Sequence, residues 1–350
     1  RANTLHGILL IALFSFAAFY IAEIPVVRRL SFSPLIVGIV LGMLYANSLR
    51  NRLPETWVPG IRFCTKQVLR WGIVLYGFRL TLAQVAAVGV PAVVVDLIVV
   101  TVTILGGVLL GRLLKIDRDT ALMTSTGSAI CGAAAVLGAE PVVKCEGYKT
   151  AIAVSTVVIF GTLSMFLYPV MYRTGMLNGM TDTEVAVYTG STLHEVAHVA
   201  GAGNAMDPTD ALGIAGTATI TKMIRVMLLA PVLVIMGFVL AGRRKESGGE
   251  TGKRRIAVPW FAFGFIGVIG LNSLLQSLCG VGTVREIPLN GTIEYVDTFM
   301  LTMAMTALGT ETSLDKFRQA GARPFVLAGL LYVWLVAGGY FVTKYVVGTL

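Results

Sequence analysis

Three ionisable residues occur within five positions of one apolar stretch of this 350-residue chain. They are His194, Glu195 and His198. Ionisable side chains are costly in an apolar environment and usually serve a function there. Imidazole and carboxyl groups take up and release protons, and their surroundings can tune where they do so. We therefore expect these three residues to carry ion-coupling chemistry.

The same three residues also fit the zinc-protease pattern His-Glu-x-x-His. In that pattern two histidines one helical turn apart bind zinc, and the glutamate acts as the base. A catalytic zinc needs a third protein ligand. Asn204 stands where an extended form of the motif has a third histidine, although Asp207 and Asp210 follow closely. An intramembrane zinc protease therefore stays open as a weaker alternative.

Two further segments contain the triplet Thr-Gly-Ser. The predicted substrate-binding residues of these segments are Thr126, Gly127, Ser128, Cys131 and Gly132 in the first, and Thr189, Gly190 and Ser191 in the second. Small and hydroxyl-bearing residues in an apolar helix permit close helix packing, or a break whose polar groups face a substrate. A helix that begins after such a break presents its N-terminal amides to an anion.

Lys222 and Arg225 interrupt the apolar run 211–241. They are three residues apart and share one helix face. The run is longer than one membrane span by roughly ten residues. The two cations could extend to the membrane interface, or they could form a positive pocket for an anion. We include both in the predicted substrate-binding set.

The composition decides the environment of these residues. Hydrophobic residues make up 55% of the chain and charged residues 13%, whereas soluble domains carry about 25% charged residues. A chain of this size could not hide so much apolar surface from water. This excludes a soluble enzyme, a disordered chain and a nucleic-acid-binding domain. The four cysteines form no CxxC pair, so no disulfide framework or cysteine zinc site is indicated.

Continuous apolar runs predict an all-α polytopic membrane protein with about eleven transmembrane helices. The first run is expected to be a transmembrane helix and not a signal peptide, because no small-residue cleavage pattern follows it. The expected spans are 5–24, 33–49, 66–85, 88–113, 120–140, 149–172, 183–204, 209–241, 257–279, 295–312 and 324–348.

The net charge of +9 comes mainly from Lys and Arg in the loops between these spans. With the N-terminus in the cytoplasm, most of the 28 basic residues fall on the cytoplasmic side, as membrane topology favours. The basic stretch 243–256 is expected to be a cytoplasmic linker. It would separate an N-terminal bundle, 1–242, which holds both Thr-Gly-Ser segments, from a three-helix part, 257–350.

Internal similarity indicates a repeat. Residues 75–89 resemble 307–321, and residues 35–48 resemble 261–273. The helices concerned run in opposite directions in the predicted topology, which is typical of inverted-repeat transporters with broken helices. A second similarity, between 126–139 and 189–202, does not fit this scheme, because those two helices would be parallel.

Four stretches resemble the YeiH-type family of proposed sulfate exporters, which are bacterial inner-membrane proteins. They are 33–47, 72–82, 127–136 and 190–203, followed by Lys222 and Arg225. The resemblance covers nearly the whole chain. It implies ten or eleven transmembrane helices, distant kinship with sodium/proton antiporters and bile-acid symporters, and transport of sulfate or a sulfonate-like anion. The family commonly carries Gln where this chain has His198, which weakens the zinc alternative.

Together these features predict a secondary transporter of a small anion that works by alternating access and is coupled to protons or to a cation such as sodium. We expect no enzymatic activity, cofactor, metal or nucleic-acid partner. The expected location is the bacterial inner membrane, with several spans and a cytoplasmic N-terminus, as one copy or a homo-oligomer. The alternative is a cation/proton antiporter in which Glu195 binds the cation and the Lys222–Arg225 pair is structural.

Overall fold

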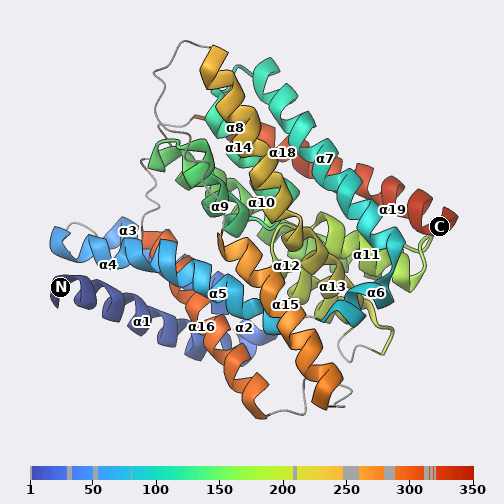
Figure 1. Ribbon diagram of the computed structural model, residues 1–350, viewed down its shortest axis with the longest axis horizontal. Coiled ribbons are helices and arrows are strands. Elements are labelled where there is room, and N and C mark those ends of the chain that lie inside the picture. The colour runs from blue at the N-terminus through green and yellow to red at the C-terminus, as the bar shows by residue number, and fades with distance from the viewer. Residues whose placement is uncertain are drawn as a thin grey trace. The chain divides into compact units, whose positions relative to one another are not determined.

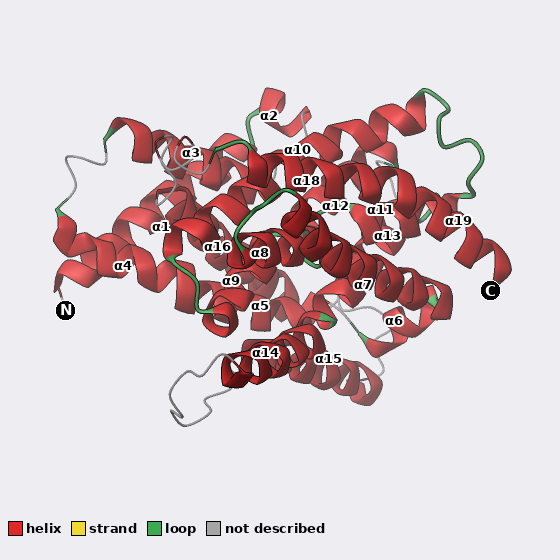
Figure 2. Cartoon of the chain, turned by 90° about the horizontal axis from the view of Figure 1, so that it is seen from above, coloured by secondary structure: helices red, strands yellow, loops and turns green. Residues whose placement is uncertain are grey.

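The computed structural model describes residues 2–29, 34–49, 54–79, 81–207, 211–246, 260–279, 288–310, 315, 318 and 321–350. All regular secondary structure in these residues is helical (Figure 2). Apolar runs favour helices in a lipid environment because a helix satisfies its own backbone hydrogen bonds. The predicted all-α class is confirmed for the part of the chain that is described.

Five of the described helices are long and apolar enough to cross a membrane. They are Asn3–Ala22, Val90–Leu113, Tyr148–Arg173, Ile214–Gly242 and Arg323–Thr349. Two shorter apolar helices are Val37–Ser48 and Phe263–Leu278. The chain is therefore a multi-pass helical membrane protein. The count of eleven spans and the inverted repeat stay predictions, and the repeat segment 307–321 lies mostly outside the described residues.

The chain forms two compact units. The first unit comprises Arg1–Gln84 and Gly264–Gln319, and the second comprises Val85–Phe263 and Ala320–Leu350. This grouping differs from a division by sequence order, because early and late segments of the chain pack together in each unit. The predicted linker 243–256 lies outside the described residues from residue 247 onward.

Glycine residues mediate close helix contacts in the first unit, whose helices are labelled in Figure 1. Its helices are α1 (Ala2–Ala22), α2 (Pro25–Arg29), α3 (Pro34–Ser48), α4 (Val58–Phe63), α5 (Leu69–Tyr76), α16 (Pro288–Thr310) and most of α15 (Trp260–Cys279). A Cβ atom on Gly42 of α3 would lie 2.2 Å from the carbonyl oxygen of Thr306, and one on Gly309 of α16 would lie 2.4 Å from that of Ile39. Glycine at both positions therefore lets the two backbones touch.

The second unit contains two pairs of short helices in which one helix follows another after a break of three residues. Its helices after α6 (Leu82–Val88) are α7 (Val90–Leu113), α8 (Arg118–Ala129), α9 (Ala133–Val143), α10 (Gly147–Arg173), α11 (Asp182–Thr192), α12 (Val196–Met206), α13 (Ile214–Met227), α14 (Leu229–Glu246), α18 (Arg323–Val333) and α19 (Gly339–Thr349). The pairs are α8 with α9 and α11 with α12. The long apolar run 211–241 is divided between α13 and α14.

The starts of α8 and α11 are fixed by polar caps. Asp117 accepts a hydrogen bond from the backbone amide of Thr120 at 3.1 Å. Thr181 and Glu184 form a reciprocal capping box at the start of α11. Such caps satisfy backbone amides that the first helical turn leaves free. They define where each helix starts and so help to position the break at its other end.

Candidate functional site

Both Thr-Gly-Ser segments lie in the last turn of a helix, immediately before a break. Residues 130–132 separate α8 from α9, and residues 193–195 separate α11 from α12. Gly132 has a φ of 71°, a conformation that side chains disfavour. A Cβ atom there would also lie 2.5 Å from Cγ of Glu195. Glycine is thus required at this point of the first break.

The hydroxyl groups of the two segments fall into two classes. Thr126 donates to the carbonyl oxygen of Leu122, and Thr189 donates to that of Val185, each at 2.7 Å within its own helix. By contrast, the buried hydroxyls of Ser128 and Ser191 make no hydrogen bond of normal geometry within the described residues. Ser128 remains available to bind a ligand, whereas Ser191 lies beside the carboxylate of Asp96. Gly127, Cys131 and Gly190 are buried beside them.

Lys222 joins the two breaks. Its side chain is completely buried on α13. The ammonium group donates to the carbonyl oxygens of Ile130 at 2.6 Å, Leu193 at 2.7 Å and His194 at 2.7 Å. Three N–H groups are all that a lysine has. Every donor of Lys222 is therefore used by backbone oxygens at the breaks.

Arg225 lies one turn further along α13 and donates hydrogen bonds to backbone oxygens at the ends of α8 and α11. It is completely buried. Nε donates to the carbonyl oxygen of Ala129 at 3.0 Å, and the two Nη atoms donate to those of Leu193 at 3.1 Å and Ser128 at 3.2 Å. The last carbonyls of a helix have no partner in the helix and form its negative end. The two cations supply both the missing donors and the opposite charge.

Glu195 contributes a negative charge to this arrangement, opposite in sign to the charges of Lys222 and Arg225. Its Oε1 accepts a hydrogen bond from the backbone amide of Ala133 at 3.3 Å. Ala133 is the first residue of α9, so the carboxylate faces the positive end of that helix. The second break thus provides an acidic side chain for the helix that follows the first break. The two broken helices are linked through Lys222, Arg225 and Glu195.

The two histidines lie against α10 and α18. A Cβ atom on Gly161 would lie 2.4 Å from Nδ1 of His198 and 3.2 Å from Cβ of His194. The His194 ring centroid lies 6.4 Å from that of Tyr332. Both imidazoles are buried, and their Nδ1 atoms have no partner among the described residues. These free nitrogens could accept or donate a proton.

The geometry does not favour the zinc-protease alternative. His194 precedes α12 whereas His198 lies within it, so the two residues do not occupy one continuous helix. Asp207 is engaged elsewhere, since its carboxylate accepts from the amides of Leu212 at 3.0 Å and Ile214 at 3.2 Å. No group of three His, Cys, Asp or Glu residues that could hold a metal occurs in the described part of the chain. Asp210 lies outside it.

Sequence reasoning missed Asp96. This residue lies in the middle of α7 and is completely buried. Neither carboxylate oxygen makes a hydrogen bond of normal geometry within the described residues. The carboxylate lies beside Ser191 and interacts electrostatically with Arg225 and Lys222. A lone acid within a span of 24 residues was the signal available in the sequence.

Comparison with known proteins identifies the family. The family model described as "Conserved hypothetical protein 698" matches residues 6–328. A UPF0324 membrane protein of Bacteroides thetaiotaomicron is 62% identical over 346 residues, which cover 97% of this chain and 98% of the relative. The UPF0324 inner membrane protein YeiH of Escherichia coli K12 is 41% identical over 339 residues, which cover 95% and 91%. The chain belongs to the YeiH-type family. The resemblance predicted from its sequence motifs is confirmed.

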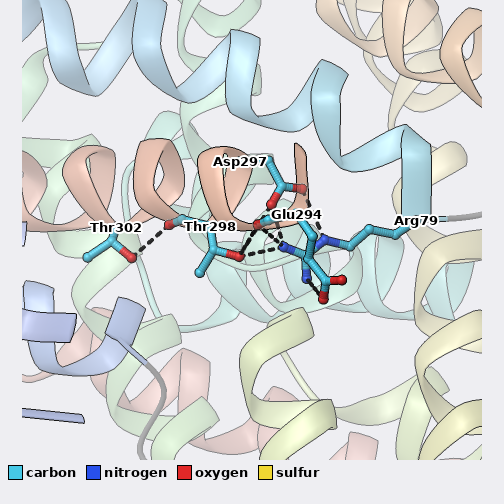
Figure 3. Close-up of polar contacts among 5 residues, drawn as sticks. All are labelled: Arg79, Glu294, Asp297, Thr298 and Thr302. Atoms are coloured by element: carbon cyan, nitrogen blue, oxygen red, sulfur yellow. Dashed lines mark hydrogen bonds and ion pairs between the residues drawn. The ribbon is translucent and has the colours of Figure 1, made fainter. Parts of the chain in front are cut away.

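This YeiH-type protein also has a partly buried ion pair in its first unit (Figure 3). Nε of Arg79 donates to Asp297 at 3.0 Å, and Nη2 donates to the other carboxylate oxygen. Nη2 also donates to the carbonyl oxygen of Glu294 at 3.0 Å and to the Thr298 hydroxyl. A bidentate arginine–carboxylate pair of this kind fixes the relative orientation of the two side chains. Because its donors are engaged, we assign it to holding α16 in place.

Proposed function

We propose that this YeiH-type protein is a secondary transporter of a small anion and that the two linked helix breaks form its substrate site. The observation that carries the proposal is the pair of buried breaks held by Lys222, Arg225 and Glu195. Non-helical backbone at membrane depth occurs where it is buried in protein or lines a cavity. Discontinuous helices are also the usual place of substrate binding in secondary transporters.

Two features favour an anion. The N-terminal ends of α9 and α12 both begin at the breaks, and the free amides of a helix start attract negative charge. The unpartnered hydroxyl of Ser128 would donate to the same ligand. Lys222 and Arg225 would act through their charge alone, since their N–H groups are engaged. A sulfate or sulfonate-like substrate is the choice that the family resemblance favours.

The charge balance of the site supports coupling to a proton. Lys222 and Arg225 carry two positive charges, and Asp96 and Glu195 carry two negative charges when ionised. An added anion would leave a net negative charge in a buried place, which is strongly unfavourable. Uptake of one proton for a monovalent sulfonate, or of two for sulfate, would restore neutrality, and Glu195, Asp96, His194 and His198 are the groups that could take them up. An inverted-repeat bundle of about eleven helices would supply the alternating access.

One observation favours the cation/proton antiporter as a second candidate. The antiporter hypothesis assigns Lys222 and Arg225 a structural role. In agreement with it, the N–H groups of both residues donate to backbone oxygens. The two buried acids would then bind the transported cation. Sodium would replace the anion as the species whose gradient drives proton movement.

Proteoliposomes with a pH-sensitive dye inside separate the two candidates. We expect a sulfate or sulfonate gradient to drive a pH change and a sodium gradient to drive none. Glu195→Gln keeps the shape of the side chain and should abolish the anion-driven pH change, whereas the exposed Glu55→Gln should leave it intact. A sodium-driven change would favour the antiporter. Undiminished pH-dependent anion uptake by Glu195→Gln would exclude the proposed role of this residue.

A further inference from the structure

The second unit has an apolar groove of about 490 Å³ between α7, α8 and α14, which we name the α7–α14 groove. These helices are labelled close together in the upper part of Figure 1. The wall of the groove includes Leu105, Leu109, Leu122, Ile235 and Val239. Three of these side chains are largely exposed in the isolated chain, with Leu105 at 65%, Leu109 at 58% and Ile235 at 61%. The groove is therefore an open, apolar surface.

The length of the groove matches one leaflet of a membrane. Along α7 it extends from Val100 to Arg112. At 1.5 Å per residue this is about 18 Å. One leaflet contributes about 15 Å to a hydrocarbon core of about 30 Å. An acyl chain that lies along the groove would start at the membrane interface and end near the midplane.

One end of the groove is basic. Arg112, in the last turn of α7, and Arg118, the first residue of α8, both line it. The nearby carboxylates of Asp117 and Asp119 are paired with Lys149 at 3.0 and 3.8 Å. Neither arginine has an ion pair or side-chain hydrogen bond within the described residues. Both guanidinium groups are therefore free to bind an anionic group at the interface.

We propose that the α7–α14 groove binds an anionic phospholipid. The phosphate would lie between Arg112 and Arg118, and an acyl chain would follow the apolar wall between α7 and α14. An apolar channel of one leaflet's length that ends in two free arginines complements such a lipid in both shape and charge. The predicted topology places this end at the cytoplasmic leaflet. The proposal is independent of what the protein transports.

Native mass spectrometry of the full chain in detergent tests this binding. We expect the protein to retain one phosphatidylglycerol, and less phosphatidylcholine with the same acyl chains. The double variant R112Q/R118Q should retain phosphatidylglycerol about 25-fold less well, from about 1 kcal/mol per basic residue. The variant K66Q/R70Q removes the same charge from the first unit and should bind as the wild type. R112K/R118K keeps the charge and should retain most of the binding.

A second variant tests the apolar wall. Val108→Trp would fill the groove and leave both arginines in place, so it should also reduce phosphatidylglycerol retention. Glycerol 3-phosphate, which is the headgroup without chains, should not compete. Equal retention of the two lipids, or wild-type retention by R112Q/R118Q, would overturn the proposal. The proposal would also be overturned if the wild-type protein were a dimer and Val108→Trp dissociated it. The occupant of the groove would then be a second copy of this chain.

Discussion

At the scale of single residues, the carboxyl group of Asp96 is unusual in its burial and hydrogen bonding. Buried polar groups are nearly always hydrogen-bonded, yet Asp96 lacks a hydrogen bond of normal geometry among the described residues. Its electrostatic partners are Arg225 and Lys222. These cations are already engaged by backbone oxygens, so Asp96 supplies charge to the site without taking their N–H groups. Such a group can gain a proton without breaking a hydrogen-bond network.

We predict that Asp96→Asn folds normally but loses proton coupling. The substitution keeps the volume of the side chain and removes one negative charge from the site, which would then carry a net positive charge. Anion binding should strengthen, by about tenfold for a change of 1.4 kcal/mol, while the anion-driven pH change disappears. Thermal stabilisation by sulfate and proteoliposome pH measurements check the two effects. Weaker anion binding together with intact coupling would contradict this role.

Residue types alone singled out several of the residues that the structure brings together at the two breaks. The sequence marked His194, Glu195, His198, Lys222 and Arg225, because ionisable residues stand out in an apolar chain. It could not indicate what the cations bind, since their partners are backbone oxygens of residues about 30 and 90 positions away. Backbone acceptors have no sequence signature. Only folding brings them to Lys222 and Arg225.

At the scale of helices, the ends of α8 and α11 depend on α13. We predict that Lys222→Met lowers the free energy of unfolding by about 3 kcal/mol or more, because it leaves buried carbonyl oxygens unsatisfied at about 1–3 kcal/mol each. Thr219→Val on the same helix removes only a hydrogen bond to Ala215 within α13 and is the matched control. Thermal unfolding in detergent measures both. Equal stability of the two variants would show that the breaks do not need the cation.

The cap of α8 gives a second prediction at this scale. Burial raises the pKa of Asp117, but hydrogen bonds from Thr120 and Lys149 outweigh it, and the pKa is lowered overall. The folded protein therefore favours the ionised form. The stabilisation is present at neutral pH and is lost as the pH falls through this lowered pKa.

We expect Asp117→Ala to reduce stability at pH 7 by about 1 kcal/mol, as for other lost helix caps. Unfolding measured from pH 7 down to acid should show the difference from the wild type shrinking as Asp117 becomes protonated. Asp182→Ala, in the first turn of α11 but outside its capping box, is the control. A difference that stays constant with pH would show that the charge of Asp117 has no part in the cap.

The sequence indicated roughly where the helices are interrupted, but not the residue at which each helix ends. The Thr-Gly-Ser triplets indicated interrupted helices, yet each break starts only after the triplet, at Ile130 and at Leu193. The triplets themselves stay helical because Thr126 and Thr189 bond back to their own helices. The excess length of the run 211–241 was also visible; a turn at Leu228 separates α13 from α14 within the single span Ile214–Gly242. Where a helix stops depends on partners outside it.

At the scale of the whole molecule, the compact units could not be foreseen from the order of the chain. The first unit joins Arg1–Gln84 with Gly264–Gln319, as when Gly42 of α3 packs against Gly309 of α16. Close glycine contacts give no signal in composition or hydropathy. The membrane class needed only the balance of apolar and charged residues, which is a property of the whole chain.

The distribution of Lys and Arg leads to a prediction about orientation in the membrane. If the N-terminus is cytoplasmic, Lys115 faces the cytoplasm and Arg28 faces the outside. Both side chains are exposed. Single cysteines at these positions, in a protein whose Cys145 and Cys279 are replaced by serine, can be labelled with a membrane-impermeant maleimide in intact spheroplasts. Cys64 and Cys131 are buried and should stay silent.

We expect Arg28→Cys to be labelled in intact spheroplasts and Lys115→Cys only after the membrane is opened. The reverse pattern would place the basic end of the α7–α14 groove in the outer leaflet of the same membrane. An anionic lipid would then have to reach Arg112 and Arg118 from the opposite side. The labelling result thus fixes both the orientation of the chain and the leaflet from which the groove is filled.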